Sequence, residues 1–124
     1  MADRKIVTAA RNVSVTATAD GLTTGLIPDY ADYVTVTSAN ADHIVTLPAP
    51  VVGKVIRGYV GANGCEIRTV ASSNVTINGE DSDGTKEAAI PSTTLFELTC
   101  VSATAWILTA ADELGAVITA IVPD

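Results

Sequence analysis

Short runs of alternating apolar and polar residues, each ended by glycine, proline or an Asn-Gly pair, constrain this chain more than any other feature. Residues 33–37 (YVTVT) alternate with a period of two, the spacing of side chains on one face of a β-strand. Further strand-like runs follow at 44–47, 54–60, 65–70, 75–77, 94–101 and 105–109. Short strands separated by turn residues predict an all-β fold, a compact antiparallel β-sandwich or barrel.

The composition agrees with this prediction. The chain has 124 residues, of which 48% are hydrophobic but only 4% are aromatic. Alanine, valine and isoleucine carry the apolar share, and threonine is the dominant polar residue. The branched Cβ atoms of valine, isoleucine and threonine pack well on a pleated, half-buried surface. A chain of this length forms one domain with a modest core.

The turn residues indicate how neighbouring strands connect. Asn63-Gly64 readily takes the positive φ angles of a tight turn, which predicts that runs 54–60 and 65–70 pair as an antiparallel hairpin. In the second run Cys65 and Ile67 fall on one face, and the charged residues between them on the other. We expect the apolar face to point inward.

The two ends of the chain are less clearly patterned. Residues 1–30 form either an extended N-terminal arm that packs on something other than its own core, or a normal first strand at 12–17 followed by a loop. The predicted domain division is therefore 1–30, the arm and first strand, and 31–124, the sandwich or barrel. Residues 110–114 predict a turn of helix ended by glycine, and 117–122 a last strand or an extended tail.

The charge argues against two classes of partner. The net charge is −7, and the seven basic residues are scattered along the chain instead of forming the cluster that nucleic acid requires. An anionic membrane surface would repel the chain for the same reason. No signal peptide or apolar run of about 18 residues occurs, so we expect synthesis in a cytoplasm.

Few residues suggest chemistry. His43 is the only histidine and has no nucleophile motif around it, so we expect no enzymatic activity. Asp81, Asp83 and Glu87 offer hard oxygen ligands, but their spacing is not that of an EF-hand loop. A solvated hairpin tip is the favoured interpretation and a weak cation site the alternative, so no cofactor or metal is expected.

The remaining candidates are apolar residues in strand-like settings. Cys65 and Cys100 lie far apart in the sequence and are interpreted as buried free thiols, although a disulfide stays open. Trp106 is interpreted as a packing anchor, with a ligand platform as the alternative.

The order of several motifs resembles a known module. Residues 45–48 (VTLP) precede 53–56 (GKVI) and a predicted hairpin. Residues 75–79 (VTING), a strand at 95–101 (LFELTCV) and 103–107 (ATAWI) follow in that order. This order resembles a small β-module of tailed-bacteriophage structural proteins, which occurs in tail fibres and in capsid decoration (cement) proteins. The resemblance covers residues 34–109.

The resemblance implies a function. It implies a homotrimer that binds the major capsid protein on the outside of a phage head and stabilises the shell, after synthesis in the host cytoplasm. The alternative is a short tail or head-fibre module that binds a host receptor or glycan. The short chain with its own initiating methionine favours decoration over a fibre fragment.

Two groups of residues are expected to make the contacts in such a protein. Apolar side chains of the last strands would fill the subunit core or the trimer seam: Phe96, Leu98, Trp106 and Leu108. Early basic residues would contact the capsid: Arg4, Lys5 and Arg11. A trimer presents three copies of each contact, so weak single contacts add up through effective concentration.

Overall fold

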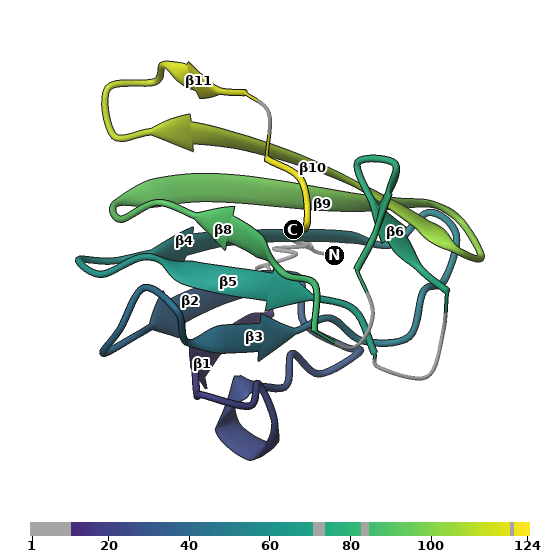
Figure 1. Ribbon diagram of the computed structural model, residues 1–124, viewed down its shortest axis with the longest axis horizontal. Coiled ribbons are helices and arrows are strands. Elements are labelled where there is room, and N and C mark those ends of the chain that lie inside the picture. Colours follow the sequence, from purple (N-terminus) through teal and green to yellow (C-terminus); the bar gives the residue numbers. More distant parts are fainter. Residues whose placement is uncertain (1–10, 71–73, 83–84, 120) are drawn as a thin grey trace, which may run out of the picture.

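The computed structural model describes residues 11–70, 74–82, 85–119 and 121–124. Over these ranges the chain is all-β, with two mixed sheets packed as a sandwich (Figure 1). The helical element in this part of the chain is the three-residue 3-10 turn η1 (Thr23–Gly25). The predicted all-β sandwich is confirmed.

None of the helical structure in the described ranges is long and apolar enough to cross a membrane.

The two sheets differ in size. The larger has eight strands in the spatial order β1-β2-β4-β9-β10-β6-β7, with β11 beside β10. Their bounds are β1 Asn12–Thr16, β2 Tyr33–Thr37, β4 Val55–Val60, β6 Thr76–Ile77, β7 Glu80–Asp81, β9 Thr94–Ser102, β10 Ala105–Asp112 and β11 Val117–Ile118. The smaller sheet has the order β3-β5-β8, with β3 Ile44–Thr46, β5 Cys65–Arg68 and β8 Ala88–Ile90.

Both sheets contain parallel pairs as well as the expected antiparallel ones. β1, β2 and β4 run parallel to one another in the large sheet, and β3 runs parallel to β5 in the small sheet. The cause is the path of the chain, which alternates between the layers from β2 to β5. Each return to a sheet therefore follows a crossover through the other layer, which is the connection that parallel strands need.

The predicted hairpin around Asn63-Gly64 is wrong. β4 pairs with β2 and β9, whereas β5 pairs with β3 and β8 in the other sheet. The turn does reverse the chain, and Gly64 has a φ of 72°. Both edges of β4 are occupied, however, by β2 and β9. The chain therefore crosses to the other layer, and β5 joins the small sheet. Val60 at the end of β4 and Cys65 at the start of β5 are both buried in the core between the two sheets.

The predicted helical turn at 110–114 is also wrong. β10 continues to Asp112 and pairs along its length with β9 as an antiparallel hairpin. The Asp112 carboxylate then accepts hydrogen bonds from the backbone N–H groups of Leu114 and Ala116, both at 2.9 Å. These bonds favour a tight reversal into β11 over the start of a helix.

The described part of the N-terminal segment follows the second interpretation, a first strand and a loop. β1 lies at the edge of the large sheet, and isolated bridges join Thr18 to Ile44 and Leu26 to Thr46 in the small sheet. Val15, Ala17 and Ile27 belong to the same core cluster as residues after position 30. Residues 1–10 lie outside the described ranges.

Candidate functional site

The four residues expected in the core or the seam all lie in the subunit core. Phe96, Leu98, Trp106 and Leu108 point inward from β9 and β10 and are buried. The fold itself covers them, so their side chains present no exposed contact area. Burial of Trp106 also removes it as a ligand platform, although its Nε1 has no hydrogen-bond partner among the described residues.

The candidate reactive residues are shielded. Cys65 and Cys100 are free and buried, as predicted. Burial, followed by the nearby Glu66 carboxylate, raises the pKa of Cys65 to about 12, so the thiol stays protonated at neutral pH. The Nδ1 atom of His43 is buried and makes no hydrogen bond within the described structure.

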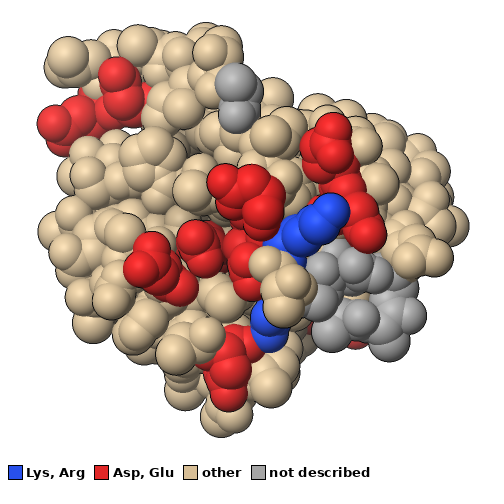
Figure 2. Space-filling model, viewed as in Figure 1, with Lys and Arg blue, Asp and Glu red and all other residues tan. Residues whose placement is uncertain are grey.

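Acidic side chains gather on the face that carries the small sheet (Figure 2). Burial raises the pKa of Glu66, and the Glu87, Asp42 and Asp124 carboxylates raise it further. Glu87 from the predicted acidic loop lies 3.8 Å from Arg68 Nη1, Asp81 is exposed on β7, and Asp83 lies outside the described ranges. Within those ranges no group of three or more His, Cys, Asp or Glu side chains is placed to hold a metal ion.

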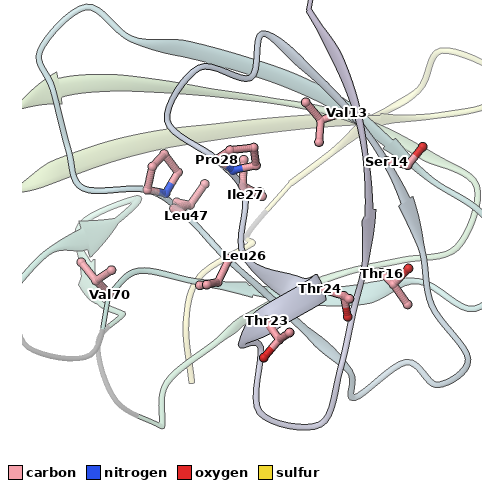
Figure 3. A pocket seen from close by; sticks show the side chains of 11 residues that line it. Val13, Ser14, Thr16, Thr23, Thr24, Leu26, Ile27, Pro28, Leu47 and Val70 are labelled. Atoms are coloured by element: carbon pink, nitrogen blue, oxygen red, sulfur yellow. The ribbon is translucent and has the colours of Figure 1, made fainter.

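A groove of about 530 Å³ lies between the edge strand β1 and the η1 segment (Figure 3). Its lining is aliphatic and hydroxyl-bearing: Val13, Ser14, Thr16, Thr23, Thr24, Leu26, Ile27, Pro28, Leu47, Pro48 and Val70. Exposed Tyr30 follows two residues after the lining proline. The groove is therefore a concave surface with no charged residue in its lining.

The outer face of the large sheet carries several exposed large apolar side chains, among them Leu95, Val101 and Ile107. It consists of the side chains that alternate with the core residues of β2, β4, β9, β10 and β11. They are Tyr33, Thr35, Thr37, Val55, Arg57, Tyr59, Leu95, Glu97, Thr99, Val101, Ala105, Ile107, Thr109, Ala111 and Val117. Strand register places one row of them side by side: Tyr59 opposite Leu95, Leu95 opposite Ala111, and Ala111 opposite Val117.

This outer face is hollowed near the start of β9. The hollow has a volume of about 550 Å³ and is lined by Tyr33, Arg57, Leu95, Phe96, Glu97, Thr109, Ala110, Ala111 and Val117. Arg57 Nε donates a hydrogen bond of 2.7 Å to Glu97 Oε2 across the β4–β9 pair. The lining is thus mostly apolar with one neutralised ion pair.

Further basic residues lie beside the hollow. The Asp32 carboxylate accepts a hydrogen bond of 3.2 Å from the Arg11 backbone N–H and lies 3.5 Å from Arg11 Nε and 3.9 Å from Lys54 Nζ. The first of these contacts lowers the pKa of Asp32 most. The Asp32 backbone carbonyl also accepts a hydrogen bond from the backbone N–H of Arg57. Because Arg57 lines the hollow, this bond connects the Asp32 cluster to it.

The turn between β10 and β11 carries the most exposed large apolar side chain of the described residues. Leu114 is 90% exposed, and Val117, which lines the hollow, is 74% exposed. The period-two pattern predicts the inward core positions, so these exposed residues were not among the predicted site residues. The outward positions of the same alternation, at Leu95 and Val117, were the signal that could have found them.

Comparisons with family models, with curated protein sequences and with solved structures found no match to this chain.

Proposed function

We propose that this chain is a structural subunit that associates with copies of itself and, as a homotrimer, decorates the outside of a tailed-phage head. In this function it binds the major capsid protein and stabilises the shell. The observation that carries the proposal is the exposed apolar outer face of the large sheet. The motif order at residues 34–109 supplies the viral context.

The outer face suits association because it is apolar, contiguous and rigid. Single exposed apolar residues are normal, whereas a contiguous patch on a folded domain marks an interaction surface. Leu95 is 51% exposed in a row with Tyr59, Ala111 and Val117, and the buried residues of β9 hold its strand in place. Such a surface loses little conformational freedom on binding.

Charge favours the same face over the opposite one. Two small-sheet faces approaching each other would bring acidic clusters together, which costs free energy at a net charge of −7 per chain. Over the described strands β2, β4, β9, β10 and β11, the outer face of the large sheet carries one acidic residue, Glu97, which pairs with Arg57. Copies therefore meet through the large sheet and direct their acidic faces outward.

Capsid contact is assigned to the N-terminal end. Arg4 and Lys5 lie outside the described ranges, and Arg11 has a side chain that is 66% exposed beside Asp32. Basic side chains early in the sequence of an acidic chain would favour contact with an acidic patch on the shell.

Binding to undecorated capsids tests this function. Purified protein is mixed with capsids, sedimented and imaged by electron microscopy, and its mass is measured by light scattering. We expect trimers and saturable density at symmetry-related lattice positions. Deletion of residues 2–9, which removes Arg4 and Lys5 and spares β1, should weaken capsid binding and leave the trimer intact. A monomer, or no lattice density, would contradict the proposal.

The second candidate is a module that binds a host receptor or glycan. The groove beside β1 favours it, because Ser14, Thr16, Thr23 and Thr24 supply hydroxyl groups and Tyr30 lies exposed nearby. A glycan array separates the two candidates. Binding that Tyr30→Ala removes, without any capsid density, would favour the receptor module.

A further inference from the structure

We propose that the turn between β10 and β11 of one copy inserts Leu114 into the hollow on the outer face of the next copy. This inference rests on the proposed self-association and specifies its contact. It assigns the two sides of the contact to different surfaces of the same chain, the turn at residues 113–116 and the hollow around Leu95.

The backbone of the turn that carries Leu114 is held by hydrogen bonds. Asp112 Oδ1 accepts the N–H groups of Leu114 and Ala116, and the Asp112 carbonyl accepts the Gly115 N–H at 2.9 Å. The Asp112 N–H closes the turn on the Ala116 carbonyl at 2.9 Å, and Gly115 has a φ of 84°. A turn fixed by four hydrogen bonds is preorganised, which lowers the entropy lost on insertion.

The hollow fits such a side chain in size and in chemistry. Its volume of about 550 Å³ lies in the range of about 300 to 1,000 Å³ that ligand pockets in proteins occupy, which is large enough for a leucine and its neighbours. Leu95, Ala111 and Val117 supply apolar lining. Leu114 remains 90% exposed in its own subunit, so it does not fill its own hollow.

The charges of the two surfaces are complementary. The turn carries Asp112 and exposed Glu113, two acidic residues. On the β2–β4 side, away from the turn of its own chain, the hollow is bordered by three basic residues against two acidic ones, namely Arg11, Lys54 and Arg57 against Asp32 and Glu97. The net sum is therefore +1 on a chain with a total of −7, and Glu113 of the inserting turn approaches Arg57.

The position of the two surfaces favours a closed ring. A contact between two different surfaces of one chain makes either a ring or an open filament. The turn and the hollow are adjacent, since Val117 lines the hollow three residues after Leu114. Each copy therefore presents both surfaces at the same end of its large sheet. In the proposed ring this end of every copy faces the common symmetry axis, and a small number of copies closes the ring.

Cysteine trapping tests the contact. Leu114→Cys and Thr109→Cys, one in the turn and one in the hollow, are expressed singly and together from two genes, and the proteins are oxidised. We expect covalent dimers only from the co-expressed pair. Wild type is the background control, because its two thiols are buried. The position control pairs Thr109→Cys with Val52→Cys in place of Leu114→Cys. Val52 is 64% exposed on another loop, and this pair should give no dimer.

The outcomes separate this contact from self-association in general. Dimers from Leu114→Cys alone would place two turns against each other and overturn the inference. Oligomers by light scattering without any cross-link would overturn it and leave the proposed function standing. A monomeric wild type would overturn both.

Charge variants give an independent measurement. Leu114→Asp should raise the dissociation constant of the oligomer at least tenfold, with an unchanged unfolding midpoint of the isolated subunit, whereas Val52→Asp should leave association unchanged. Arg57→Glu should weaken association, and Glu113→Arg in the same chain should restore it. Absence of this rescue, together with normal association of Leu114→Asp, would overturn the inference.

Discussion

Asn78 and Leu108 form a reciprocal pair of hydrogen bonds between the β6–β7 turn and strand β10. The Leu108 backbone N–H donates to Asn78 Oδ1 at 2.8 Å, and Asn78 Nδ2 donates to the Leu108 carbonyl at 3.0 Å. The same amide nitrogen donates to the Ile121 carbonyl at 2.8 Å. One side chain thus joins a turn, a central strand of the large sheet and the C-terminal segment.

Asn78→Asp is expected to lower the free energy of unfolding by about 2 to 4 kcal/mol. The new carboxylate keeps the acceptor for the Leu108 N–H but faces the Leu108 and Ile121 carbonyl oxygens without a donor. Denaturant unfolding monitored by Trp106 fluorescence measures the effect. Asn63→Asp is the matched control, because its amide makes one exposed hydrogen bond, to the Ser38 carbonyl. Equal losses in the two variants would contradict the role of Asn78.

Gly58→Ala is expected to destabilise the sandwich by about 1 to 3 kcal/mol or more, as overpacking of a filled core does. A Cβ at this position would lie 2.5 Å from Phe96 Cζ, 2.6 Å from Val34 Cγ2 and 2.8 Å from the Val34 carbonyl oxygen. The backbone oxygen cannot move as a side chain can. Gly61→Ala is the control, because nothing lies within 4 Å of its added Cβ. A shift of the unfolding midpoint in both variants would contradict this explanation.

Period-two alternation predicted most strands because it reports which side chains point inward. Val34 and Val36 on β2, and Phe96 and Leu98 on β9, are buried as the pattern requires. The pattern does not report which strand lies beside which. A turn such as Asn63-Gly64 reverses the chain both in a hairpin and in a crossover between the two layers, so it does not decide between them. The observed pairing of β4 with β9 is between strands that are distant in sequence.

The candidate surface could be predicted only in part. Leu95 and Ile107 occupy outward positions that any alternation count identifies as exposed and apolar. Leu114 was instead included in a predicted helical turn, because Ala-Ala-Asp-Glu-Leu has good helix formers. Formation of the hollow depends on β11 returning beside β10, through a turn held by the Asp112 carboxylate and by backbone hydrogen bonds.

Neither cysteine is expected to react with a thiol reagent in the folded protein at pH 8. Burial raises the pKa of Cys65 to about 12 and also raises the pKa of Cys100, so the reactive thiolate is scarce and covered. Titration with a chromogenic disulfide should find no accessible thiol in native protein and two after unfolding. Rapid reaction of one thiol under native conditions would contradict the burial of that residue.

The same shift predicts a loss of stability in alkali. The folded-state pKa of Cys65 exceeds its ordinary value of 9.0, so the folded state keeps a proton that the unfolded state releases. The contribution to stability is complete below pH 9 and falls as pH rises toward about 12. Between pH 9 and about 12, the unfolding midpoint of Cys65→Ala should fall less steeply with pH than that of wild type, whatever the effect of the substitution at pH 7.

Glu66→Gln is expected to raise the free energy of unfolding at pH 7. Burial, and then the Glu87, Asp42 and Asp124 carboxylates, raise the pKa of Glu66 above its ordinary value of 4.5. A raised carboxyl pKa favours the folded state below the unfolded pKa, and that advantage disappears as pH rises through the folded pKa. The neutral amide does not ionise and so does not undergo this loss. The free energy of unfolding of the variant should therefore exceed that of wild type most at pH 7 and least below pH 4.5.

Denaturant unfolding at several pH values measures the difference between the two proteins. Glu80→Gln removes the same charge at an exposed position that is not among the carboxylates acting on Glu66, and it should show a smaller difference with a weaker pH dependence. The opposite pH dependence, with the largest gain for Glu66→Gln below pH 4.5, would mean that the Glu66 carboxylate stabilises the fold. The acidic small-sheet face would then be a stabilised charge network, and its repulsion would no longer explain why copies are proposed to meet through the large sheet.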